Sequence, residues 1–150
     1  MTSALQSAVV ASLLAYAASG SPDVDGLLVP KVVEPYGGQL LNPDRLVGVT
    51  PALYVELDKG ARQRRGTSSV FTGLSRTDLI GATRNAAHGD RKHHEGAALM
   101  AWAMAWAEEA EVVVGRQVLV VDKIDWRRYA MDREVRTWTG ILTLTWSLAT

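Results

Sequence analysis

The segment from Glu134 to Leu148 alternates two kinds of side chain. Its large apolar set is Trp138, Leu142, Leu144, Trp146 and Leu148. The intervening, mostly hydroxyl-bearing set is Val135, Thr137, Thr139, Ile141, Thr143, Thr145 and Ser147. Because successive side chains of a strand point to opposite faces of a sheet, the segment is predicted to form one long strand, or two joined at Gly140. One face of that sheet needs an apolar cover, whereas the other suits water or a neighbouring subunit.

Two segments have the spacing of helices that could provide this cover. The first, Ala4–Ala18, has Ser3 and Gln6 in capping-box spacing at its start and Gly20 after its end. Its core-facing stripe comprises Leu5, Val9, Leu13 and Tyr16. The second, Glu95–Ala110, is rich in the helix-forming residues Ala, Leu, Met and Glu. Its apolar positions recur every three or four residues at Leu99, Trp102, Ala103, Trp106 and Ala110.

Four tryptophans are expected to lie in the core. Trp102 and Trp106 could form a stacking platform for nucleic acid bases, but a pair at this spacing on an Ala-rich helix is more typical of core packing. Trp138 and Trp146 share one face of the closing strand and are expected to pack under the helices.

Two further segments are predicted to be extended. Pro51–Leu57 alternates Leu and Val with other residues and should be a strand whose Leu and Val face the core. Leu27–Val33 is apolar but is interrupted by Pro30, which suits an edge strand or an extended arm, since proline cannot donate a backbone hydrogen bond.

The rest of the chain has a weaker pattern. Val70–Thr72 is a candidate short strand, and Thr77–Ala87 is interpreted as a weak helix or irregular chain. Gln117–Ile124 is predicted to be a strand and Asp125–Asp132 a charged connection. The order of elements predicts a single α+β domain over residues 1–150, with two helices packed on one face of a mostly antiparallel sheet and a long mid-chain basic loop.

The composition is that of one ordinary globular domain. The chain has 150 residues, of which 47% are hydrophobic and 21% charged, and its formal net charge is zero. This balance excludes the overall basic surface of a dedicated nucleic-acid binder. Cysteine is absent, which excludes disulfides, a thiolate nucleophile and a zinc site built on sulfur.

The charges nevertheless fall in blocks. Residues 1–58 carry a net charge of −4, residues 59–94 carry +6, residues 95–111 carry −4 and residues 112–150 carry +2. The basic excess is densest at Lys59, Arg62, Arg64 and Arg65. These four cations are candidate contacts for phosphate groups or for an acidic protein surface, and an ordinary solvated loop is the alternative.

A second candidate contact group surrounds Trp126. It stands beside Arg127 and Arg128 in a charged stretch, so it is interpreted either as an exposed contact residue or as part of a local cation–π stack.

Targeting signals are missing from the sequence given. The apolar run Ala8–Ala18 contains Ser12 and Tyr16 and is shorter than the roughly 20 residues that span a bilayer. The first basic residue is Lys31, whereas a secretory signal begins with positive charge. A cytoplasmic protein without a membrane partner is therefore expected.

Standard catalytic signatures are absent from the sequence, which contains no phosphate-binding loop, dinucleotide fingerprint or nucleophile elbow. One stretch holds potential metal ligands, namely His88, Asp90, His93, His94 and Glu95. The zinc-protease helix signature requires a histidine four residues after His94, and Ala98 occupies that position. The favoured interpretation is a polar loop with Glu95 at the positive start of the next helix. The chain is thus expected to be no enzyme and to hold no cofactor, and a small metal-dependent hydrolase or nuclease using this cluster is the alternative.

The layout as a whole carries a family resemblance. Its elements are the helix Ala4–Ala18, the strand Pro51–Leu57, a long mid-chain loop, the helix Glu95–Ala110 and the closing strand Trp138–Trp146. In this order they make the chain similar to the tail terminator, or tail completion, proteins of long-tailed bacteriophages, particularly the minor tail proteins of Mu-like phages. The likeness covers most of the chain and lies in layout, because the family has no invariant catalytic residues. It implies a regular strand within residues 66–94.

The resemblance implies a structural virion protein. Proteins of this family form hexameric rings that stop tail-tube growth and present a surface to the head connector, so the expected partners are other copies of the chain, the tail tube protein and the connector. The expected location is the virion tail, assembled in the host cytoplasm. Basic loops could line a lumen and contact passing DNA without sequence preference. Candidate subunit contacts are Pro30, Thr137, Thr139, Thr143 and Thr145. A head-completion or neck adaptor protein is a related alternative.

Overall fold

The computed structural model describes residues 4–20, 25–41, 46, 48–57, 75–84, 89–132 and 137–149. Within these ranges the chain forms two α-helices, one short 3-10 helix and six strands. In chain order the elements are α1 (Ala4–Ala18), β1 (Val32–Pro35), η1 (Gln39–Leu41), β2 (Ala52–Leu57), β3 (Ser75–Arg84), α2 (Gly89–Glu109), β4 (Glu111–Val114), β5 (Gln117–Asp132) and β6 (Thr137–Leu148). Neither of the described helices is both long enough and apolar enough to cross a membrane.

The strands form one sheet in the order β1-β2-β3-β6-β5-β4. β1 runs parallel to β2, and the other four pairings are antiparallel. The predicted α+β class and the mostly antiparallel sheet are confirmed, and the parallel β1–β2 pair is a feature that the sequence pattern did not indicate.

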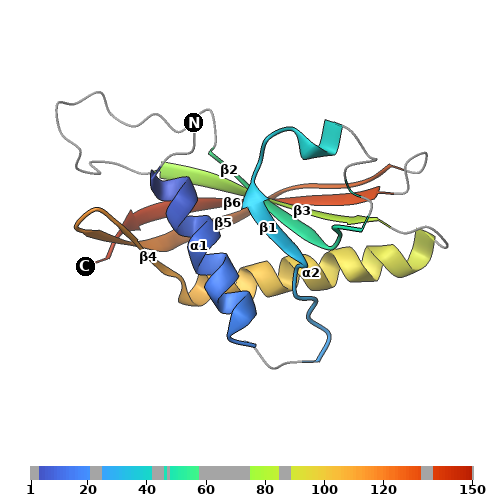
Figure 1. Cartoon of the computed structure of the whole chain (residues 1–150), viewed down its shortest axis with the longest axis horizontal. Helices are drawn as coiled ribbons and strands as arrows, with labels where there is room; N and C mark the ends of the chain where they lie inside the picture. The colour runs from blue at the N-terminus through green and yellow to red at the C-terminus, as the bar shows by residue number, and fades with distance from the viewer. Residues whose placement is uncertain are drawn as a thin grey trace.

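The helix α1 contacts β1, β2 and β4, and α2 contacts β3, β5 and β6. Since β1 and β4 are the two edges of the described sheet, a single helix can contact both only if the sheet curls around it. Figure 1 shows α1 crossing the strands with β4 on one side and β1 on the other, while α2 runs along them.

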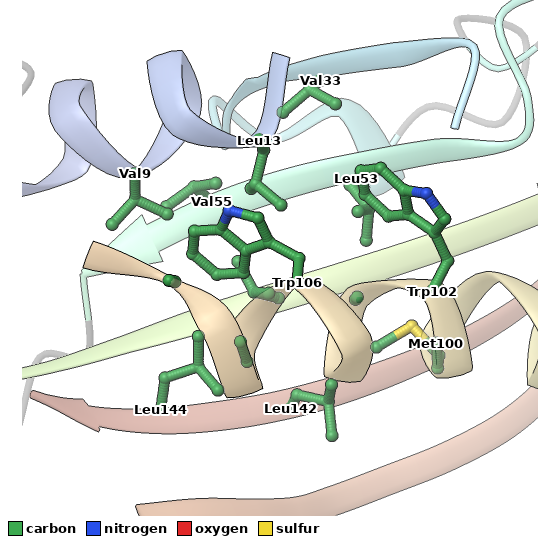
Figure 2. Packing of buried hydrophobic residues seen from close by; sticks show 14 of the residues in the cluster. Val9, Leu13, Val33, Leu53, Val55, Met100, Trp102, Trp106, Leu142 and Leu144 are labelled. Atoms are coloured by element: carbon green, nitrogen blue, oxygen red, sulfur yellow. The ribbon is translucent and has the colours of Figure 1, made fainter. Parts of the chain in front are cut away.

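The main core lies between the helices and one face of the sheet. Trp102 and Trp106 are 0% and 2% exposed, which confirms their assignment to the core. Figure 2 shows both indoles pointing from α2 toward α1 and β2, where they meet Leu13 and Leu53. The same cluster takes in Trp138, Leu142, Leu144 and Trp146 of β6, so their expected burial is confirmed as well, whereas Leu148 at the end of the strand is 43% exposed.

A smaller cluster lies on the opposite face at the β1–β2–β3 end of the sheet. Its buried members are Leu46, Ala52, Tyr54, Ile80 and Ala82. Tyr36, Leu40 and Val49 from the connection between β1 and β2 pack against it, and this connection lies on the side of the strands away from α2 (Figure 1). The second face of the sheet is therefore covered at one end by a loop rather than by a helix.

Two predictions about local structure are wrong. Thr77–Ala87 is not helical or irregular, because Ser75–Arg84 is the central strand β3, paired with both β2 and β6. Both of its faces are buried, with Leu79 in the main core and Ile80 in the smaller cluster, so the alternation that signals a half-exposed strand is missing. The predicted mid-chain basic loop is thus interrupted by a strand.

The second wrong prediction concerns Asp125–Asp132, which continues β5 instead of forming a connection. The pairing of β5 with β6 is irregular between Val121 and Lys123 and again between Trp126 and Arg128. Each irregularity shifts the alternation of inward and outward side chains along β5. The sequence of this strand therefore lacks the regular two-residue period by which strands are recognised. The helix α2 also begins at Gly89 rather than at Glu95, whereas Val70–Thr72 lies outside the described residues.

Candidate interaction surface

The face of β6 that carries the threonines points away from the helices, and charged residues flank it on the neighbouring strands. Glu56 of β2 is in register with Asp78 of β3, Asp78 with Thr143 of β6, and Thr143 with Asp125 of β5. Residues in register share a face and lie on strands about 4.8 Å apart, so these four side chains form a row across the sheet. We call it the acidic row.

The next row on the same face has the opposite charge. Arg76 of β3 is in register with Thr145 of β6, and Thr145 with Lys123 of β5. We call these three residues the basic row. The two rows are adjacent because residues two positions apart on a strand share a face. The face away from the helices therefore presents a line of negative charge beside a line of positive charge.

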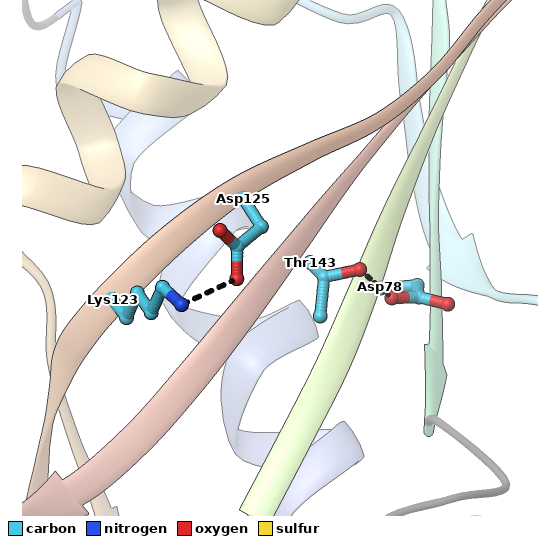
Figure 3. A network of polar contacts seen from close by, with 4 residues as sticks. All are labelled: Asp78, Lys123, Asp125 and Thr143. Carbon is cyan, nitrogen blue, oxygen red and sulfur yellow. Dashed lines mark hydrogen bonds and ion pairs between the residues drawn. The ribbon is translucent and has the colours of Figure 1, made fainter.

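Two contacts hold this surface together, as Figure 3 shows. The Thr143 hydroxyl Oγ1 donates a hydrogen bond of 2.6 Å to Asp78 Oδ1. Lys123 Nζ lies 3.6 Å from Asp125 Oδ2, in an ion pair whose side chains are 67% and 47% exposed. Such an exposed pair contributes at most about 1 kcal/mol to folding, so its charges remain available to a partner.

The predicted contact threonines themselves expose little surface. Thr137, Thr143 and Thr145 are between 4% and 8% exposed, and Thr139 is half-buried. The longer charged side chains of the two rows therefore supply most of the surface that a partner could reach on this part of the sheet. Pro30, the fifth candidate interface residue, is buried just before the edge strand β1.

The other sequence-predicted contacts do not join this surface. Lys59, Arg62, Arg64 and Arg65 lie outside the described residues. Trp126 belongs to β5 and is in register with Leu142, so it lies on the helix-bearing face, with 41% of its surface exposed. Arg127 and Arg128 follow it in β5, at the second irregularity, and their side chains are not among those described.

The candidate metal ligands fall at the start of α2. The first turns of this helix contain Asp90, His93 and His94, whose side chains are not among those described. Glu95 is exposed, and His88 lies outside the described residues. Across the side chains that are described, His, Asp and Glu nowhere gather in a group of three able to hold a metal ion.

A shallow hollow near the C-terminal end of α2 was not predicted. It measures about 390 Å³ and is lined by Ser12, Ala15, Tyr16, Trp106, Glu109, Ala110 and Glu111. Trp106 Nε1 donates a 3.0 Å hydrogen bond to Ser12 Oγ at this site. Partial burial, with Glu109 and then Glu108 nearby, raises the pKa of the Tyr16 hydroxyl above its ordinary value. The net charge of −4 over residues 95–111 was the sequence signal that could have located this acidic hollow.

The two charged rows were also missed, for a different reason. Asp78 lies in Thr77–Ala87, the segment interpreted as helical or irregular, and Arg76 directly precedes that segment. Asp125 lies in the segment interpreted as a connection. Register between strands that are distant in sequence cannot be deduced from the alternation within any one of them.

No family model matches the chain, and no curated protein matches it. Among solved structures, one chain superposes with a TM-score of 0.49 at 12% sequence identity, over 98% of this chain and 94% of its own length.

Proposed function

We propose that the protein is a structural subunit of a bacteriophage tail, which assembles into a hexameric ring that caps the tail tube and joins it to the head connector. The proposal rests on the layout resemblance and on one observation from the structure. The helices cover one face of the sheet, while the other face presents the adjacent acidic and basic rows over β3, β6 and β5.

Such a surface suits a contact between subunits. A ring is built from one repeated head-to-tail contact, so each copy needs two different, complementary surfaces. Parallel lines of opposite charge favour a single register of a partner, because a shift by one row places like charges together. The chain also carries oppositely charged segments, with a net +6 over residues 59–94 and −4 over residues 95–111, which can match one another between copies.

The charge pattern can be tested without disturbing the fold. The double variant Lys123→Glu/Asp125→Lys retains the ion pair within the chain but exchanges the charges of the two rows at β5. If the rows bind a neighbouring subunit, this variant fails to form rings, although its free energy of unfolding stays within about 1 kcal/mol of the wild-type value. If the pair serves only its own chain, the double variant assembles normally, and that result would contradict the proposed contact.

A matched control comes from the residue that directly precedes Lys123 in the same strand. Asp122 is exposed and lies at the first irregularity of β5, between residues that are in register with β6. Asp122→Lys makes a charge change comparable to that of Asp125→Lys but outside both rows. Ring assembly should survive it, as measured by mass photometry over a range of protein and salt concentrations.

A further inference from the structure

The strand β4 is one edge of the sheet that the described strands form. It covers Glu111–Val114, is joined to β5 by a turn at Gly115 and Arg116, and has β5 as its one partner among the described strands. Gly115 has a φ of +64°, the left-handed conformation that a tight two-residue hairpin turn requires and that glycine adopts without strain.

The register of this hairpin places the backbone groups of β4. Val114 is opposite Gln117, Val113 opposite Val118, and Glu111 opposite Val120. In an antiparallel hairpin the pair that closes a two-residue turn is the hydrogen-bonded kind, and the two kinds of pair then alternate. Val113 and Glu111 therefore direct their backbone N–H and C=O groups away from β5, toward the free edge.

The side chains of this edge favour pairing instead of preventing it. Val113 is 62% exposed and its cross-strand neighbour Val118 is 37% exposed, both on the face away from the helices. The opposite edge differs, because β1 ends at Pro35, and proline lacks the N–H that an added strand would need. Natural edge strands are usually protected by charge, proline or a bulge, and β4 carries three consecutive valines.

The charges at the two ends of β4 specify how a second strand would lie. Glu111 precedes the valines and Arg116 follows them in the turn, and both are exposed. When two copies of β4 lie antiparallel with Val113 at the centre, Glu111 of each copy comes next to Arg116 of the other. A parallel arrangement would place Glu111 beside Glu111 and Arg116 beside Arg116, which repel.

From these observations we propose that β4 pairs antiparallel with β4 of a second copy of this chain about a two-fold axis, joining two sheets into one. The contact uses the same surface on both copies and closes on itself, so it differs from the head-to-tail contact of a ring and does not depend on it. Because each copy contributes a strand of four residues, the buried area falls below the roughly 1,600 Å² of a standard stable interface. The dimer should therefore form reversibly, with a population that rises with protein concentration.

The decisive experiment mixes two charge variants. Glu111→Arg makes both ends of β4 positive, and Arg116→Glu makes both ends negative. The dimer dissociation constant of each variant alone should be up to about tenfold higher than that of the wild type, because like charges then meet at both ends of the contact. A one-to-one mixture should recover dimers, and so should the double variant Glu111→Arg/Arg116→Glu, as measured by sedimentation velocity. Self-association of either single variant equal to that of the wild type, or a mixture that associates no better than its components, would overturn the proposal.

A backbone variant separates strand pairing from charge. Val113→Pro removes an N–H that faces the free edge, whereas Val113→Thr keeps it and keeps a β-branched side chain. We expect the proline variant to be monomeric and the threonine variant to dimerise. Hydrogen exchange of the wild type gives a second readout that needs no variant, since the Val113 amide should become protected as protein concentration rises. An amide whose protection is independent of concentration would contradict pairing at this edge.

Discussion

The indole ring of Trp138 in β6 lies against the Cα of Gly96 in α2, in the space that a Cβ atom at Gly96 would occupy. Gly140, two residues along β6, contacts the same ring, and Gly81 in β3 receives Met100 of α2 in the same manner. Glycines on both the helix and the sheet thus allow α2 to approach the sheet closely. This approach positions the core on one face and leaves the charged rows on the other.

Replacing Gly96 by alanine should destabilise the protein even though alanine is the better helix former. The propensity gain is about 1 kcal/mol, while overpacking in a close contact typically costs about 1 to 3 kcal/mol, and here the obstacle is a rigid ring. We expect a net loss of stability in chemical denaturation. Adding Trp138→Phe should reduce the cost of Gly96→Ala, and a cost unchanged in that background would show that the contact does not limit packing.

Trp106→Ala should cost about 3 to 5 kcal/mol, because it removes a buried indole that contacts both α1 and β6. The rings of Trp106 and Trp146 lie 6.0 Å apart in an edge-to-face arrangement, and this contact is lost too. Trp126→Ala is the matched control, since that side chain is 41% exposed and its loss should cost far less. Equal melting temperatures for Trp106→Ala and the wild type would refute the assignment of this face of α2 to the core.

Ionisation of the Tyr16 hydroxyl should contribute to the pH dependence of folding stability. Its pKa lies above the ordinary 10.0 because of burial and the carboxylates of Glu109 and Glu108. The unfolded chain therefore ionises this hydroxyl first as the pH rises, so the stability it contributes is complete below about pH 10 and is lost as the pH approaches the folded pKa. Tyr16→Phe keeps the ring that packs on Trp102 at 5.2 Å but should lose less stability than the wild type over that alkaline range. Parallel stability curves for the two proteins would contradict this account.

The basic segment should act in assembly rather than in folding. Reversing Lys59, Arg62, Arg64 and Arg65 to glutamate changes the charge of a segment that the sequence predicts to contact phosphate or acidic protein. The melting temperature should stay close to that of the wild type, while the yield of complete particles should fall. Any DNA binding that the variant loses should be strongest at low salt and independent of sequence. Full particle yield with normal tail length would show that these cations are merely solvated.

Local patterns predicted two elements well. The helix Ala4–Ala18 was predicted with the bounds that it has, from its capping-box residues, the glycine after its end and the spacing of its large apolar residues. The closing strand was predicted nearly so, because its large apolar and its hydroxyl-bearing side chains alternate. The strand β3 could not be recognised this way, since Leu79 and Ile80 are both buried on opposite faces. The second half of β5 escaped recognition because two irregularities displaced its alternation.

The candidate surface could be predicted only in part. The threonines of β6 were assigned to one face from their spacing, and the register confirms that they share it. The neighbours that give this face its charge are Asp78 and Arg76 on one side and Asp125 and Lys123 on the other. These come from segments far apart along the chain, and only the pairing of β3, β6 and β5 brings them together.

The most direct test of the proposed function is electron microscopy of the full chain mixed with isolated phage tail tubes, together with mass photometry of the chain alone. A ring-forming terminator should give closed particles containing six copies, and these should sit at one end of the tubes. The proposed β4 pairing by itself gives only dimers, so the two ideas are separable in the same measurement. Monomers and dimers at every concentration, with bare tube ends, would contradict the proposed function.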